Sequence, residues 1–168
     1  MKIAIVVLLF AASALAQTPN TRLPVACGQG DVSFKVKLDD TQNTLAQPEA
    51  GKALVYFIQE KGMPFGPLVT RIGLDGAWVG AGKNSSYFSV SVEPGEHHVC
   101  ASVQSVQSYL GHPVGFLHFK AEAGKVYYFN ARVISGESTA YLFFGAEDSD
   151  QAKYQIATFP LSVSSPKK

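Results

Sequence analysis

The side chains best suited to chemistry in this 168-residue chain are its two cysteines and a pair of adjacent histidines. On an extended strand, His98 and Cys100 lie on one face because successive side chains alternate between faces. His97 then points the other way and cannot share a metal ion with them. If Cys27 were a free thiol nearby, these groups would suit zinc or copper, which accept imidazole and thiolate ligands.

A disulfide between Cys27 and Cys100 is the competing use of the same thiols. The chain begins like an exported protein, with a positively charged start, an apolar run over residues 3–12 and a small-residue cleavage site at residues 14–16. Exported proteins meet an oxidising environment, in which paired cysteines form disulfides. Because Cys100 alternates with apolar neighbours, the bridge would hold an N-terminal arm against the outside of a sheet. We favour the disulfide and keep the metal site as the alternative.

A further hypothesis is that Cys27 is acylated and anchors the protein to a membrane. The segment Leu23–Cys27 resembles a lipoprotein signal in which the cysteine is acylated. Pro24 stands where such signals carry an aliphatic residue, and a polar segment separates the apolar run from Cys27. The apolar run is also too short for a permanent membrane-spanning helix. We therefore expect cleavage after Ala16, no lipid, and a secreted or periplasmic protein.

Other chemistry finds little support in the sequence. Residues 80–83 resemble the end of a phosphate-binding loop, but the required flanking residues are missing and a strand follows, so we interpret them as a turn. No G-x-S-x-G motif marks a nucleophile, and the acidic residues are scattered. With 14 basic and 13 acidic residues, the chain has no electrostatic footprint for nucleic acid. We expect no cofactor and no enzymatic activity.

The hydrophobic pattern predicts strands separated by turns. Asp75-Gly76 suits a tight hairpin turn, and Pro94-Gly95 a second reversal. Apart from the strand that contains Cys100, the pattern predicts strands at residues 32–38, 53–58, 68–74, 88–92, 116–121, 126–134 and 138–144. The continuous apolar run at residues 53–58 indicates a central strand covered on both faces.

This spacing predicts an all-β fold, a single antiparallel β-sandwich of about eight strands. A short C-terminal helix over residues 149–157 would be capped by Ser149. The expected organisation is a signal peptide at residues 1–16, an N-terminal arm at 17–30, the β-sandwich at 31–161 and a flexible tail at 162–168. Two similar segments, at residues 49–52 and 122–125, each precede an aromatic-rich strand and suggest one turn design used twice.

A binding surface is predicted at the Asp75–Gly82 hairpin, whose tip is the Asp75-Gly76 turn, with Trp78 as its anchor. Trp78 lies beside this tip, and a tryptophan offers a large rigid contact area at little conformational cost. Tyr87, on the strand that follows, is taken as part of the same surface. The competing interpretation is that Trp78 folds back to cover the end of the core.

Several motifs together resemble a known family. They are AGKALVYF, LDGAWVG, SYFSVSVEPGEHHVCAS, FKAEAGKVYYF and DSDQAKY, which extend from about Ala50 to Tyr154. This ordered set resembles a bacterial exported family of unknown function, DUF2846, and the portion around VEPGEH also resembles the PEGA type of small β module. The resemblance implies an immunoglobulin-like or PEGA-like sandwich of the cell envelope. It supplies no catalytic residues to carry over.

The function predicted from the sequence is therefore a non-enzymatic binding or structural role in the envelope. The expected partner is an envelope protein or glycan rather than nucleic acid, with no transmembrane segment after signal removal. A periplasmic metal-binding protein that uses His98 and Cys100 is the alternative.

The export prediction is tested by the intact mass of the protein purified from its native envelope. We expect a chain that begins at Gln17 and carries no lipid, because the apolar run ends at the small-residue site over residues 14–16. A mature chain that begins with an acylated Cys27 would contradict both the cleavage site and the absence of an anchor.

Overall fold

The structure is a computed structural model, and it describes residues 24–42, 44–62, 68–104, 112–135 and 139–167. Within these residues no helix combines the length and apolarity needed to cross a membrane. In chain order the elements are η1 (Val25–Cys27), β1 (Phe34–Asp39), β2 (Ala53–Gln59), β3 (Val69–Leu74), β4 (Ala77–Lys83), β5 (Ser86–Val92), β6 (Gly95–Val103), β7 (Val114–Ala121), β8 (Val126–Ser135), β9 (Ala140–Ala146), α1 (Ser149–Thr158) and β10 (Leu161–Pro166).

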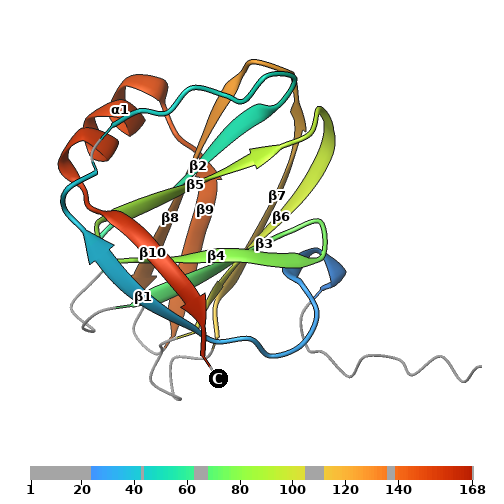
Figure 1. The fold of residues 1–168 in the computed structure, drawn as a ribbon. Coiled ribbons are helices and arrows are strands. Elements are labelled where there is room, and N and C mark those ends of the chain that lie inside the picture. The colour runs from blue at the N-terminus through green and yellow to red at the C-terminus, as the bar shows by residue number, and fades with distance from the viewer. Residues whose placement is uncertain (1–23, 43, 63–67, 105–111, 136–138, 168) are drawn as a thin grey trace, which may run out of the picture.

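The strands form two sheets that pack face to face (Figure 1). The larger sheet has six strands in the order β1-β10-β5-β2-β8-β9, and the smaller has four in the order β4-β3-β6-β7. The predicted all-β class with a short C-terminal helix is confirmed. The prediction of eight antiparallel strands is wrong, because the described residues form ten strands and the larger sheet is mixed. In it, β2 runs parallel to β8, and β10 runs parallel to β5.

The central strand β2 is buried along its whole length, as its unbroken apolar sequence predicts. Alternate side chains serve two different cores because they project to opposite faces. Val55 and Phe57 point between the sheets, where Phe57 contacts the rings of Phe88 and Phe129. The other face is covered by α1, which makes β2 the boundary between an inner core and an outer core.

The outer core lies between the larger sheet and α1 (Figure 1). Its buried members are Leu54, Tyr56, Ile58, Tyr87, Ala152 and Ile156. The helix begins after Asp148, whose carboxylate accepts hydrogen bonds from the backbone of Asp150 and Gln151. The cap is therefore Asp148 and not Ser149, one residue earlier than predicted. An aspartate suits this position because its charge also complements the helix dipole.

The two similar sequence segments form two similar turns that lie side by side. Each has a glycine in the left-handed region, Gly51 with φ 81° and Gly124 with φ 76°. The segments lead into β2 and β8, which pair in parallel, so the turns are neighbours at one end of the sheet. The Gly124 N–H donates to the carbonyl of Lys52, and the Leu54 N–H donates to that of Lys125. The repeated sequence thus reflects one turn design used by two adjacent strands.

Three local predictions are corrected by the structure. Residues 80–83 form the end of β4 and not a turn, since the reversal comes at residues 84–85. Residues 162–166 are not a flexible tail, because they form most of β10 and pair with β1. The Pro94–Gly95 reversal does not make a hairpin, because β5 and β6 belong to different sheets and this turn carries the chain between them.

Candidate functional site

The Asp75–Gly76 turn is a tight hairpin, as predicted. Asp75 has φ 50° and Gly76 φ 87°, so both central residues adopt the positive angles of this hairpin class. Leu74 and Ala77 pair across it. The Gly76 N–H approaches the carbonyl oxygen of Ala26 at 3.4 Å, which brings the N-terminal arm against the tip. The tip is therefore in contact with the arm rather than standing alone.

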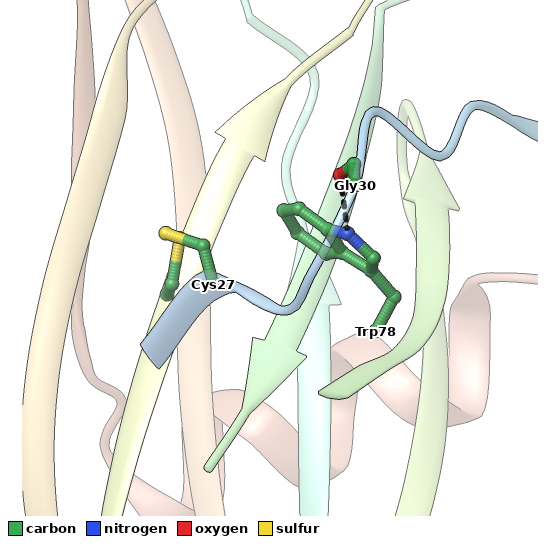
Figure 2. Close-up of a disulfide and its surroundings, with 4 residues drawn as sticks. Cys27, Gly30 and Trp78 are labelled. Atoms are coloured by element: carbon green, nitrogen blue, oxygen red, sulfur yellow. Dashed lines mark hydrogen bonds between the residues drawn. A yellow bond between two sulfur atoms is a disulfide. The ribbon is translucent and has the colours of Figure 1, made fainter. Parts of the chain in front are cut away.

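Trp78 is half-buried and contacts that arm (Figure 2). Its indole N–H donates to the carbonyl of Gly30 at 3.3 Å. A Cβ on Gly28 would lie 2.8 Å from the Trp78 backbone nitrogen, so only glycine permits this close approach. The guanidinium of Arg71 stacks over the indole ring of Trp78, 4.5 Å from the ring centroid. These internal contacts account for the position of Trp78 without an external ligand.

Arg71 also holds the N-terminal arm, through hydrogen bonds to Asp31 and Val32. Its side chain is buried, and Nη1 donates to Asp31 Oδ1 at 3.0 Å and to the carbonyl of Val32 at 2.5 Å. A buried guanidinium needs such acceptors because an unpaired charge away from water is costly. The arm residues from 26 to 32 thus run across the smaller sheet under three kinds of restraint: backbone contact, side-chain hydrogen bonds and a covalent bond.

The covalent bond is the disulfide between Cys27 and Cys100, which confirms the predicted pairing (Figure 2). Both residues are fully buried, and η1 packs against β6 and β3. Gly73 lies directly beneath Cys27, where an added Cβ would collide with the backbone. The prediction that Cys100 lies on the outer side of β6 is also correct, because its neighbours Val99 and Ala101 belong to the core between the sheets. With both thiols used, the alternative metal site at His98 and Cys100 is not supported.

The two adjacent histidines have different surroundings. His98 is exposed and faces His118 across β6 and β7, with ring centroids 6.2 Å apart. Among the described residues, no group of three or more His, Cys, Asp or Glu side chains gathers to hold a metal ion. His97 instead bonds to acceptors through both ring nitrogens, with Nδ1 2.6 Å from Asp75 Oδ2 and Nε2 2.7 Å from the Glu93 carbonyl oxygen.

Two acceptors can both be satisfied only when both imidazole nitrogens carry protons. Partial burial by itself lowers the pKa of His97, but the hydrogen bonds to Asp75 and Glu93 and the Asp75 charge outweigh it and raise the pKa above 6.5. Burial likewise opposes ionisation of Asp75, yet bonds from the His98 backbone and from His97 hold the pKa of Asp75 below 3.8. Below the raised pKa of His97, the pair joins the β3–β4 hairpin to β6 as an imidazolium and a carboxylate.

Tyr87 does not belong to the hairpin surface. It lies in the larger sheet, is 2% exposed, and its hydroxyl donates to the carbonyl of Gln42 at 2.6 Å. Its ring packs near that of Tyr56 in the outer core beneath α1. The prediction that Tyr87 shares a binding surface with Trp78 is therefore wrong.

One exposed apolar cluster on paired strands was not predicted as a site. Ile134, Tyr141 and Phe143 project from the outer face of β8 and β9 with 40%, 61% and 53% of their surfaces exposed. Ile134 pairs with Tyr141, and Arg132 pairs with Phe143, whose ring lies 5.9 Å from the guanidinium. We call these four residues the aromatic strip. The sequence does contain a signal for it, because residues 140–144 are apolar on both alternating faces.

Arg132 of the aromatic strip also contacts a polar group formed by Glu60 and by Gln155 of α1. The guanidinium of Arg132 lies 3.6 Å from a carboxylate oxygen of Glu60, and Gln155 of α1 donates to the same carboxylate at 2.7 Å. The guanidinium of Arg132 thus lies between the Glu60 carboxylate and the Phe143 ring. Its charge is still half exposed and available to a ligand.

A scan against protein families matches residues 49–146 to a protein of unknown function (DUF2846). The matched segment includes β2 to β9, and therefore the hairpin, Cys100 and the aromatic strip. The chain belongs to the DUF2846 family. This confirms the family predicted from the motifs, while the PEGA-like part of that resemblance remains a prediction. Searches of curated proteins and of solved structures gave no match.

The disulfide makes a testable contribution to stability in this DUF2846 member. It closes a loop with a sequence separation of 73, and in the chain-entropy model a loop of this length contributes about 4 kcal/mol at 25 °C. We expect the double variant Cys27→Ala, Cys100→Ala to lose up to this amount in urea unfolding. The wild type with reductant is the matched comparison. Unchanged stability in both would contradict the structural role of the bridge.

The His97–Asp75 pair predicts a pH dependence of stability. Because the pKa of His97 is raised on folding, its contribution is complete below pH 6.5 and is lost as the pH rises through the folded value. The contribution of Asp75 is complete above pH 3.8 and is lost as the pH falls through its lowered value. The pair therefore stabilises most between these two pH values.

We expect His97→Gln to be destabilising at pH 6, with the difference from wild type shrinking as the pH is raised above neutrality. Urea unfolding at several pH values measures this. His112→Gln, which changes an exposed histidine, is the control. A His97→Gln difference that stays constant across this range would show that the imidazolium is not the stabilising form.

Proposed function

We propose that this protein is an exported, non-enzymatic binding module of the cell envelope, and that it binds a protein partner through the aromatic strip. Export is supported by the signal-like N-terminus and by the disulfide, a bond that persists mainly in oxidising compartments. The observation that carries the binding role is the exposure of Tyr141 and Phe143 on paired strands, where folding does not require aromatic side chains.

The composition of the strip favours a protein as its ligand. Tyr, Phe and Arg are enriched at protein interfaces, and large rigid side chains dominate their binding energy. Small organic ligands instead need a concave site that encloses most of their surface. The cavity found between the two sheets, lined in part by Phe57, Thr70 and Phe144, has room for about one water molecule. An exposed apolar surface with a half-exposed arginine fits a protein surface better.

The placement on regular strands also suits recognition. Tyr141 and Phe143 are two residues apart on β9, so they share a face and their spacing is set by the strand. Ile134 and Arg132 are their cross-strand partners on β8, and Glu60 and Phe143 together orient Arg132. Such a preorganised surface loses little side-chain entropy on binding. This contrasts with Trp78, whose ring is already engaged by the N-terminal arm.

The proposal is tested by placing the photo-reactive residue p-benzoylphenylalanine at Tyr141 or Phe143 in the native envelope. We expect both positions to yield the same covalent protein adduct. Tyr154, which is 66% exposed on α1, is the matched control and should not yield it. Once the partner is identified, Tyr141→Ser should weaken its binding by roughly 2 kcal/mol or more, as for an interface hot spot.

Because Tyr141 is exposed, Tyr141→Ser should leave the stability of the free protein within about 0.5 kcal/mol. Equal adducts from positions 141 and 154 would contradict the proposal. So would adducts that contain only a second copy of this chain, or only glycan.

A further inference from the structure

Strand β9 is an edge strand that lacks the protection found on the other edges. The two sheets have four edge strands, β1, β9, β4 and β7, and each edge exposes backbone groups that can pair with another strand. Proteins usually block such edges with charged residues, prolines or covering segments. Strand β9 has the sequence AYLFFGA, with neither charge nor proline, and within the described residues it pairs only with β8.

The other three edges are each blocked in a recognisable way. Strand β1 carries Lys35 and Lys37, and strand β7 carries Lys120. Strand β4 is covered by β10, where Ala81 donates its N–H to the hydroxyl of Ser164. Strand β7 also packs beside β9, but β9 is the one of these four edge strands whose sequence contains no charged residue and no proline, which argues that it serves as an interface.

The sequence of β9 is complementary to itself in the antiparallel direction. With Phe143 placed on a two-fold axis, Ala140 lies opposite Ala146 of a second copy, Tyr141 opposite Gly145, and Leu142 opposite Phe144. All seven residues of the strand are then paired. Alanine faces alanine, the large apolar residues at 142, 143 and 144 face one another, and Tyr141 faces a glycine. An aromatic ring opposite a glycine is a favourable cross-strand arrangement, because the ring covers the exposed backbone.

Within one chain, the Phe143 ring lies 3.6 Å from the position that a Gly145 Cβ would occupy, so it borders this glycine. The partner's Tyr141, placed opposite Gly145, would be a diagonal neighbour of this ring, within the reach of aromatic side chains in antiparallel pairs. Strand β7 approaches β9 on the inner side of the sheet, where its Gly115 packs against Phe144.

We propose that two copies of this chain associate through antiparallel pairing of β9 with β9, centred on Phe143. The association is isologous, so the same strand serves both subunits and the contact closes as a dimer. It joins two six-stranded sheets into one continuous sheet and places two aromatic strips side by side. The inference does not rest on the proposed function, since it concerns the purified chain alone.

Sedimentation velocity of the purified mature protein tests the association. We expect a dimer at ~100 μM, a concentration at which a Kd of roughly 10 μM gives mostly dimer. Phe143→Lys should give a monomer, because it places two like charges opposite each other on the axis. Tyr154→Lys introduces the same charge on the exposed face of α1 and should remain dimeric. A monomeric wild type, or a dimeric Phe143→Lys, would overturn the proposal.

Cysteine cross-linking tests the register without relying on a disruptive change. Opposed residues of an antiparallel pair have Cα atoms about 4.5–5.5 Å apart, within disulfide range. Phe143→Cys would meet its own copy and form an intermolecular disulfide when oxidised with dipyridyl disulfide. The native cysteines are already bonded to each other, so the new thiol is the reactive one.

Tyr141→Cys is the matched control, because in this register it faces Gly145 and not itself. We expect little cross-linking from Tyr141→Cys alone, and efficient cross-linking when it is mixed with Gly145→Cys. Equal cross-linking of Phe143→Cys and Tyr141→Cys, or none from Phe143→Cys, would overturn the register.

Discussion

The burial of β2 on both faces is the constraint on which the rest of the structure depends. All seven of its side chains are buried, so the chain must supply cover on each side. The smaller sheet covers one face and α1 covers the other. Its neighbour β8 runs parallel to it, and a parallel neighbour cannot be reached by a short turn. The intervening residues make that connection by building the smaller sheet and inserting β5 on the way.

Sequence periodicity predicted the strands but not how they pair. Alternation and turn residues are local properties, so β1, β3 and the Asp75–Gly76 hairpin could be located from them. The parallel pairing of β2 with β8 depends on contacts between residues more than 70 positions apart. Strand β4 was partly missed because its glycines lack apolar side chains. Gly80 has no room for one, since an added Cβ would lie 2.9 Å from the ring of Phe88.

The candidate sites show the same division between local and non-local information. The disulfide could be predicted because the chain has two cysteines and a signal-like start, and because strand parity places Cys100 on the outer side of β6. The burial of Tyr87 could not, since its side of the strand is covered by α1, which lies far away in the sequence. Trp78 lies beside the hairpin tip as predicted, but the arm that contacts it begins some 50 residues earlier. An outward-facing residue is exposed only where no other segment covers it.

The small size of α1 explains why the larger sheet is left open at its sides. Even if it ran straight across the strands, its ten residues would cover about 15 Å, whereas six strands spaced about 4.8 Å apart span roughly 24 Å. The helix therefore covers the centre of the sheet over β2 and β5, and both sides remain exposed. On β1 the exposed positions include Lys35 and Lys37, but on β9 they hold Tyr141 and Phe143. The two uncovered margins of the sheet therefore differ in their exposed side chains, with lysines on β1 and aromatic residues on β9. Since lysines satisfy the fold at one margin, stability alone does not require aromatic residues at the other.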